Sequence, residues 1–239
     1  MKCTGIVLAA GQGKRMNSKI QKQFLCLQGY PVLYYSLKAF QECPWMQEVV
    51  LVTGLEEIEY CRKEIVEHYG FTKVKAVVAG GKERYHSVQN GLKACETADY
   101  VFIHDGARPF LNGEILERGL ECVKEWKACV AGMPSKDTVK LVDERGVVCS
   151  TPDRKRVWNV QTPQVFSYDL IADAYEKALQ GDCTDITDDA MVVEKYGNHP
   201  VKLYEGSYEN IKLTTPEDLP VAETFMAKNG SVFVDVLGI

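Results

Sequence analysis

Apolar runs of seven to nine residues alternate with longer amphipathic segments in the first half of the chain, and this alternation constrains the fold most. Strands that are apolar almost throughout are typical of parallel sheets covered by helices on both faces. The sequence therefore predicts an α/β fold with a doubly wound, mostly parallel sheet. The expected strands are TGIVLAA (4–10), EVVLVTG (48–54), KVKAVVAGG (73–81) and DYVFIHDG (99–106), and the helices that follow cover 30–43, 55–70, 84–95 and 111–126.

A single domain is expected over residues 1–239, because a chain of this length can bury a full α/β core and contains no repeat or low-complexity linker. The apolar tail at 230–239 is expected either to add a strand or to stay undocked, and we assign it no function. The later elements are expected to be helices at 167–180, 187–197 and 214–228 and strands at 200–206 and 210–214.

Composition excludes several classes of protein. Charged residues make up 26% of the chain, and a net charge of -5 disfavours nucleic acid as the partner. The first apolar stretch is too short for a signal peptide, and no run approaches the ~18 apolar residues of a membrane span. The nine cysteines form no CxxC pair, and the four histidines do not lie at zinc-ligand spacing near them. We therefore expect a cytoplasmic protein with reduced thiols and no membrane partner.

The loop that follows the first expected strand is rich in glycine and in cations. In LAAGQGKRMNSKIQKQF (8–24), Gly11 and Gly13 can expose backbone N–H groups in a conformation that other residues adopt with difficulty. Such a nest, surrounded by cations, binds anions, and phosphate is the natural guest. The cations of this loop are Lys14, Arg15, Lys19 and Lys22.

Neither common glycine-loop motif fits this segment. Met16 stands where a dinucleotide fingerprint needs its third glycine, and the second expected strand ends without a carboxylate. Lys14 is followed by Arg15, whereas a P-loop needs serine or threonine there. The excess of cations favours attack at an α-phosphate with pyrophosphate leaving, where positioning and electrostatics do most of the work. A solvated basic loop remains the alternative.

Two further loops, AGGKERYHS (79–87) and HDGARP (104–109), follow other strands of the same expected sheet. Because ligands of such sheets bind outside the carboxyl ends of the strands, we expect these loops and the first one to face a single crevice.

The segment 135–160 departs from the alternating pattern. VKLV (139–142) and VVCS (147–150) flank the turn-forming DERG, which predicts a projecting β-hairpin arm with partly apolar strands. The same arm of a second subunit is the expected cover, which predicts a homodimer. The alternative is an arm folded against its own domain.

A resemblance to a known family rests on these motifs. LAAGQGKRM with the following KQF resembles the signature of nucleotidyltransferases that transfer a nucleoside monophosphate to a phosphorylated sugar or polyol. Between about Thr4 and Ala227, the chain is similar to the 2-C-methyl-D-erythritol 4-phosphate cytidylyltransferase family in the order of seven further motifs. These are AGGKERYHSV, HDGARPF, DTVK, TPDR, WNVQTPQVF, TDITDDA and NIKLTTPEDL.

The resemblance implies a Rossmann-like nucleotidyltransferase fold and transfer of CMP from CTP to 2-C-methyl-D-erythritol 4-phosphate, with release of pyrophosphate. It also implies Mg²⁺ bound mainly through the CTP phosphates. Ribitol 5-phosphate cytidylyltransferase shares the first loop, the arm and QTPQ, and stays open as an alternative. RYHS (84–87) and TPDRKRVW (151–158) favour the methylerythritol acceptor. A nucleotide-binding regulatory module without turnover is the other alternative.

The resemblance also assigns roles to residues. Lys22, Arg15 and Arg154 would be catalytic, with Lys22 at the α-phosphate. Asp105 would contact both nucleotide and acceptor and would be the one protein ligand of the metal. Thr138 and Arg154 would reach from the arm of one subunit into the site of the other. The remaining nucleotide-binding residues would be Ala9, Ala10, Gly11, Gly13, Gly80, Gly81 and Ser87, and the remaining acceptor-binding residues would be Arg108, Thr162, Thr187 and Lys212.

Some positions carry two interpretations or depart from the family. Arg84 either touches ligand or holds its loop, and Asp188 either orients Thr187 or begins a helix. Gln21 replaces a usual proline, and Lys82 and Gly106 also differ from the usual residues.

Overall fold

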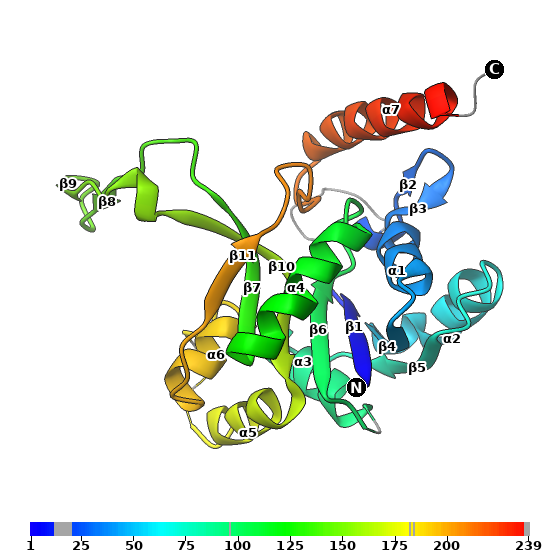
Figure 1. The fold of residues 1–239 in the computed structure, drawn as a ribbon, viewed down its shortest axis with the longest axis horizontal. Helices are drawn as coiled ribbons and strands as arrows, with labels where there is room; N and C mark the ends of the chain where they lie inside the picture. Colours follow the sequence, from blue (N-terminus) through cyan, green and yellow to red (C-terminus); the bar gives the residue numbers. More distant parts are fainter. Residues whose placement is uncertain (12–20, 96, 182, 184, 237–239) are drawn as a thin grey trace.

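A seven-stranded sheet forms the centre of the computed structural model, which describes residues 1–11, 21–95, 97–181, 183 and 185–236 (Figure 1). Its strands are β1 (Cys3–Ala9), β4 (Met46–Thr53), β5 (Val74–Ala79), β6 (Tyr100–Asp105), β7 (Ala128–Pro134), β10 (Trp158–Ser167) and β11 (Lys202–Glu205). The spatial order is β11-β7-β10-β6-β1-β4-β5. The four strands expected in the first half of the chain are β1, β4, β5 and β6, and all pair in parallel.

One antiparallel strand interrupts this parallel order. β10 lies between β6 and β7 and runs antiparallel to both, while β11 pairs with β7 in parallel. The sheet is therefore mostly parallel, as expected. Because β10 carries QTPQ, its position in the middle of the sheet brings this motif beside the end of β6.

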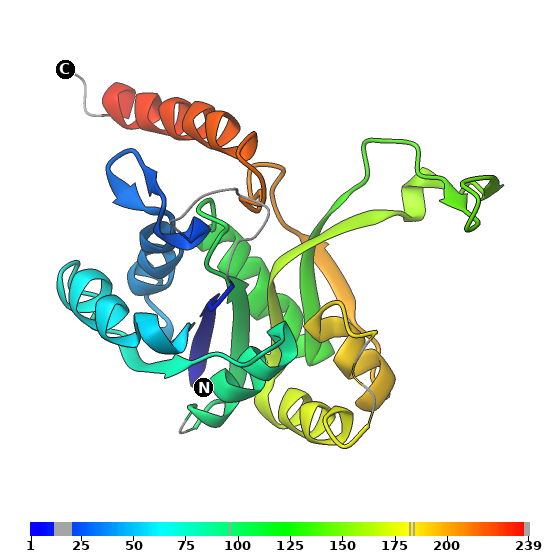
Figure 2. The same ribbon diagram turned by 180° about the vertical axis from the view of Figure 1, so that it is seen from behind.

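Helices cover both faces of the sheet (Figures 1 and 2). Phe40 and Leu116 belong to the apolar cluster on one face, and Val88 and Tyr175 belong to the cluster on the other. The first face is covered by α1 (Val32–Glu42), α4 (Gly113–Trp126) and the segment 55–67; the second is covered by α3 (Arg84–Lys93), α5 (Tyr168–Ala178) and α6 (Asp189–Tyr196). This arrangement confirms the doubly wound fold.

The helical pattern predicted over 55–70 forms three short helices in succession. They are the 3-10 helix η3 (Leu55–Glu57), α2 (Ile58–Tyr60) and the π-helix η4 (Cys61–Glu67). Cys61 and Ile65 are buried four residues apart, so one apolar face continues through the last of these helices.

The predicted hairpin is present and projects from the sheet (Figures 1 and 2). β8 (Leu141–Val142) pairs antiparallel with β9 (Val148–Ser150), and the Asp143 carboxylate accepts hydrogen bonds from two backbone N–H groups of the turn between them. Leu141 is 55% exposed and its apolar neighbours on the arm are similarly exposed. The hairpin is confirmed, whereas its cover by a second subunit stays a prediction.

The end of the chain differs from expectation in two places. The segment 210–214, predicted as a strand, joins no described sheet; its Leu213 N–H instead donates to the Ala107 carbonyl at 2.9 Å. Residues 230–236 of the tail, which was expected either to add a strand or to stay undocked, instead continue the final helix α7 (Asp218–Val236). α7 packs on the small hairpin formed by β2 (Cys26–Leu27) and β3 (Tyr30–Pro31). None of the described helices is long and apolar enough to cross a membrane.

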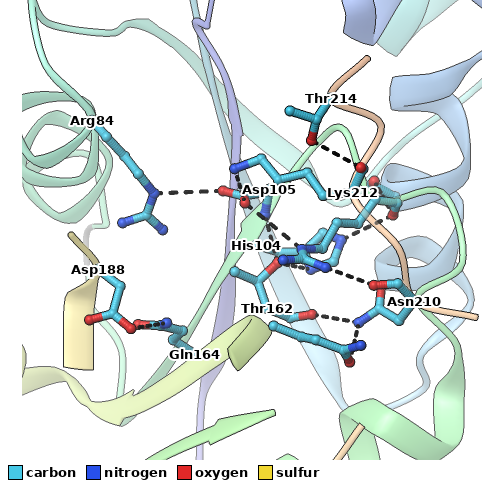
Figure 3. Close-up of polar contacts among 12 residues, drawn as sticks. Arg84, His104, Asp105, Thr162, Gln164, Asp188, Asn210, Lys212 and Thr214 are labelled. Atoms are coloured by element: carbon cyan, nitrogen blue, oxygen red, sulfur yellow. Dashed lines mark hydrogen bonds and ion pairs between the residues drawn. The ribbon is translucent and has the colours of Figure 1, made fainter. Parts of the chain in front are cut away.

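A hydrogen-bonded network ties β6 to β10 and to the segment 210–214 (Figure 3). The Asp105 N–H donates to Thr162 Oγ1 at 3.1 Å, and the Thr162 hydroxyl lies 3.0 Å from His104 Nδ1. His104 Nε2 lies 3.3 Å from the Arg108 carbonyl, which can only accept, so Nε2 carries the proton and Nδ1 accepts from Thr162. Asn210 Nδ2 closes the network by donating to the Thr162 carbonyl at 2.8 Å. Neutral His104 is the form that this network requires.

This network predicts a pH dependence of stability. Burial, aided by nearby Arg108 and only partly opposed by Asp105, lowers the pKa of His104 to about 4. Between pH 6.5 and 4 the unfolded chain therefore binds more protons, and the free energy of unfolding should fall as pH drops, by up to about 3 kcal/mol from this group. Urea unfolding at several pH values measures the slope. His104→Asn, which keeps an acceptor for Thr162, should show a shallower slope, and equal slopes in the two proteins would contradict the account.

Candidate active site

A cavity of about 670 Å³ opens at the carboxyl ends of β1, β5 and β6. The loops after β5 and β6 line it together with the end of β1, as the sequence predicted for this edge of the sheet. Gly13 and Arg15 fall within 12–20, outside the described residues. The cavity is lined by Leu8, Ala9, Ala10, Gly11, Lys22, Gln23, Gly81, Lys82, Glu83, Arg84, Ser87, Asp105, Ala107 and Lys212.

The loop after β1 and the loop after β5 meet at Gly80. A Cβ atom on Gly80 would lie 2.4 Å from the Ala10 Cβ and 2.8 Å from the Ser87 Oγ, so no side chain fits there. The Gly80 N–H donates to the Thr53 carbonyl at 2.7 Å, and the Gly81 N–H donates to Ser87 Oγ at 3.0 Å. The two loops therefore approach closely and form one wall of the cavity, which consists largely of backbone and small side chains.

Asp105 is the centre of an ion-pair cluster beside this wall (Figure 3). Its side chain is 11% exposed, and its carboxylate lies 2.7 Å from Lys212 Nζ, 3.6 Å from Arg84 Nε and 3.9 Å from Arg108 Nε. Burial alone would raise the pKa of Asp105, but the three cations outweigh it and hold that pKa well below its usual range. Asp105 is therefore ionised at neutral pH.

Arg84 connects this cluster to α6. Its two terminal nitrogens donate to the two carboxylate oxygens of Asp189, each at 2.8 Å, and Asp189 is 0% exposed. Tyr175 donates its hydroxyl to the same carboxylate at 2.6 Å. Burial lowers the pKa of Arg84, but the carboxylates of Asp189 and Asp105 raise that pKa by more than burial lowers it, so the guanidinium stays charged. Arg84 thus holds α3 to α6 while lining the cavity.

Asp188 begins helix α6 rather than contacting Thr187. Asp188 Oδ1 accepts from the Met191 N–H at 2.9 Å, and its Oδ2 accepts from Gln164 Nε2 at 2.9 Å. The exposed Thr187 hydroxyl lies 3.7 Å from the Met191 sulfur.

The structure gathers some of the predicted acceptor-binding residues and separates others. Lys212 and Arg108 both lie at Asp105, and Thr162 lies beside it, 4% exposed and with its hydroxyl engaged by His104. Thr138 and Arg154 are exposed on the arm and do not line the cavity of their own chain. Arg154 Nη1 donates instead to the Lys136 carbonyl at 3.3 Å, within the arm.

Three residues that shape the site were not predicted from the sequence. Asp189 neutralises Arg84, Asn210 binds the Thr162 carbonyl, and Gln23 donates to the Ala9 carbonyl at 2.6 Å. They lie in the motifs TDITDDA, NIKLTTPEDL and KQF, in which a polar side chain was the only sequence feature that could have indicated a role in the site.

The residues present fit a metal ion only in a limited way. Among the described residues, no group of three or more His, Cys, Asp or Glu side chains could hold a metal. Asp105 lines the cavity, but both of its oxygens already face cations. Mg²⁺ commonly takes one or two carboxylates and completes its shell with water and substrate phosphates. A lone carboxylate such as Asp105 would therefore be enough only for an ion whose other ligands are water and a triphosphate.

Comparison with known proteins places this geometry in a family. Residues 3–228 match the family described as 2-C-methyl-D-erythritol 4-phosphate cytidylyltransferase (IspD). The protein of that name from Lachnoclostridium phytofermentans is 48% identical over 228 residues, which cover 95% of this chain and 97% of that protein. The protein of that name from Lachnospira eligens is 51% identical over 224 residues, which cover 93% of this chain and 98% of that protein.

Solved structures agree with these sequence matches. The 4-diphosphocytidyl-2C-methyl-D-erythritol synthase of Anaerococcus prevotii aligns with a TM-score of 0.83 at 34% identity, over 95% of this chain and 96% of that one. The 2-C-methyl-D-erythritol 4-phosphate cytidylyltransferase of Francisella tularensis aligns with a TM-score of 0.77 at 28% identity, over 93% and 98%. The chain therefore belongs to the 2-C-methyl-D-erythritol 4-phosphate cytidylyltransferase family.

Proposed function

We propose that the protein transfers CMP from CTP to 2-C-methyl-D-erythritol 4-phosphate, giving 4-diphosphocytidyl-2-C-methyl-D-erythritol and pyrophosphate. The charge balance of the cavity supports this proposal most strongly. Its lining contains four cations, Lys22, Lys82, Arg84 and Lys212, against two carboxylates, Glu83 and Asp105. This excess suits a triphosphate and a second phosphorylated substrate, and family membership supports the identity of both.

CTP would lie with its triphosphate along Ala9, Ala10 and Gly11 and its base near Gly80 and Gly81. Backbone N–H and C=O groups at such a wall can read the edge of a base, and a closely packed wall limits the size of the base that fits. The contact of Ala10, Gly80 and Ser87 supports this placement because it joins the two loops in one surface.

The acceptor phosphate is already ionised at neutral pH, so its oxygen needs no general base. It attacks the α-phosphorus of CTP, a new P–O bond forms, and the bond to pyrophosphate breaks. Lys22, as a compact charge, would stabilise the negative charge that builds on the α-phosphate oxygens. Arg15 would assist at the triphosphate, and Arg154 of the partner subunit at the reacting phosphates.

The acceptor would bind on the Asp105 side of the cavity, near Arg108, Thr162, Thr187 and Lys212. Lys212 has three N–H donors, so it can bind a phosphate oxygen while keeping its ion pair with Asp105. Mg²⁺, with Asp105 as its protein ligand, would neutralise part of the triphosphate charge when bound.

The proposal includes a cytoplasmic homodimer in which Thr138 and Arg154 of each arm enter the cavity of the other subunit. Exposed apolar side chains on the arm support the dimer, since a lone hairpin of this kind lacks cover. All nine cysteines are free, which suits a reducing compartment such as the cytoplasm.

Pyrophosphate release tests the proposed reaction. The purified protein with Mg²⁺, CTP and 2-C-methyl-D-erythritol 4-phosphate should release pyrophosphate, while UTP or ATP in place of CTP should give little. Release only with ribitol 5-phosphate would overturn the proposed acceptor. No release with either acceptor, despite CTP binding, would favour a binding module without turnover.

Lys22→Ala should lower kcat by roughly 10²–10³, the loss typical of one preorganised transition-state contact. The melting temperature should stay near that of the wild type, because Lys22 lies at the cavity and outside the apolar clusters. Lys93→Ala, at the exposed far end of α3, is the matched control and should keep full activity. A folded Lys22→Ala enzyme with normal kcat would refute the role of Lys22.

Arg154→Ala should also inactivate the homodimer if the arm completes the partner's cavity. A heterodimer of one Arg154→Ala subunit and one Lys22→Ala subunit contains one intact site, in which Lys22 and Arg154 come from different chains. Purified heterodimers should therefore regain activity that neither homodimer shows. Heterodimers as inactive as both parents would contradict a site shared between subunits.

A further inference from the structure

Lys22 lies on a segment that is too short to hold its own position. It begins the three-residue 3-10 helix η2 (Lys22–Phe24), in which the Phe24 N–H donates to the Gln21 carbonyl and the Leu25 N–H to the Lys22 carbonyl. A single helical turn is only marginally stable by itself. Contacts made by the residues on either side of Lys22 therefore help to hold this turn in place.

A chain of side-chain hydrogen bonds supplies such contacts on both sides of Lys22. Gln21 Nε2 donates to Glu57 Oε1, and Gln23 Nε2 donates to Gln21 Oε1, each at 2.5 Å. Gln23 Nε2 also donates to the Ala9 carbonyl at 2.6 Å, and Gln23 is 1% exposed. These hydrogen bonds thus link η3, just after β4, to the last residue of β1 through the two residues that flank Lys22.

Glu57 is held in place for this contact from its own side. Its N–H donates to the Gly54 carbonyl at 3.1 Å, and a Cβ atom on Gly54 would lie 1.9 Å from Glu57 Oε2. The carboxylate therefore folds back over a residue that has no side chain. Its charge strengthens the hydrogen bond from the Gln21 amide.

A ring contact adds a second anchor from the same part of the fold. Phe24 packs edge-on against Tyr60 of α2, with ring centroids 5.2 Å apart. Because η3 and α2 are consecutive, the segment 55–60 supports the Lys22 turn with one polar and one apolar contact.

We propose that Glu57 is a positioning residue for Lys22 and acts through Gln21 and Gln23. This inference rests on the proposed function of Lys22 at the α-phosphate. Glu57 does not line the cavity, so it has no assigned contact with substrate. Its loss should displace the Lys22 turn while leaving the nucleotide wall at Gly80 and Gly81 in place, and kcat should fall more than the KM for CTP rises.

Glu57→Ala should lower kcat roughly 10-fold or more, because a misplacement of about 1 Å can cost up to 10²-fold in rate. Glu57→Gln keeps an acceptor oxygen for Gln21 and should retain most of the activity. Glu56→Ala is the matched control: Glu56 is the exposed neighbour on η3, with no hydrogen bond or ion pair among the described contacts. It should behave as the wild type.

A double-mutant cycle separates positioning from a general structural effect. In a Lys22→Ala background, adding Glu57→Ala should lower kcat no further, whereas a structural defect would lower it again. Gln21→Met removes the hydrogen bonds of the Gln21 side chain to Glu57 and Gln23. It should reproduce the kcat loss even if Glu57→Ala fails to fold. Melting temperatures establish which variants are folded.

The outcomes distinguish this inference from the function on which it rests. A folded Glu57→Ala or Gln21→Met protein with normal kcat would overturn the role of Glu57 while leaving the role of Lys22 intact. A further full loss in the Lys22→Ala background would overturn it too. A Lys22→Ala protein with normal kcat would remove the assigned function of Lys22, and the inference would fall with it.

Discussion

The buried carboxylate of Asp105 is the interaction on which the site depends. Three cations, Arg84, Arg108 and Lys212, could not share this edge of the sheet without a counter-charge, because like charges repel strongly where water is largely excluded. Asp189 supplies a second negative charge for Arg84. Asp105 and Asp189 thus hold these cations near the cavity before any anion binds. Lys22 and Lys82 add further positive charge to the lining of the cavity, which suits a phosphate ligand.

The topology of the sheet brings these charges together. β6 ends at Asp105 beside β1, and the antiparallel β10 places Thr162 against the Asp105 backbone. The segment 210–214 crosses this edge and carries Lys212, while Asn210 fixes it to the Thr162 carbonyl. Separate parts of the chain thus contribute one charge or one hydrogen bond each, and Figure 3 shows their convergence on Asp105.

Much of the fold followed from local patterns in the sequence. The four parallel strands and the hairpin were predictable because apolar periodicity and turn residues act over short distances. The prediction of a strand at 210–214 was wrong. The apolar residue Leu213 packs against β2 and α7, so the alternating pattern of this segment reflects that contact and not pairing in a sheet. The pairing of Arg84 with Asp189 was not predictable, since the residues lie 105 positions apart and only the folded sheet brings α3 and α6 together. The contact of Gln21 with Glu57 escaped prediction for the same reason.

A crystal structure of the protein with CTP and 2-C-methyl-D-erythritol 4-phosphate bound would test directly whether the Asp105 cluster organises the phosphate site. We expect the triphosphate along Ala9–Gly11 beside Lys22, the base against Gly80 and Gly81, and the acceptor phosphate on the Lys212 side of Asp105. A nucleotide bound elsewhere, such as the crevice lined by Tyr35, Trp45 and Phe110, would contradict the claim that the Asp105 cluster organises the phosphate site.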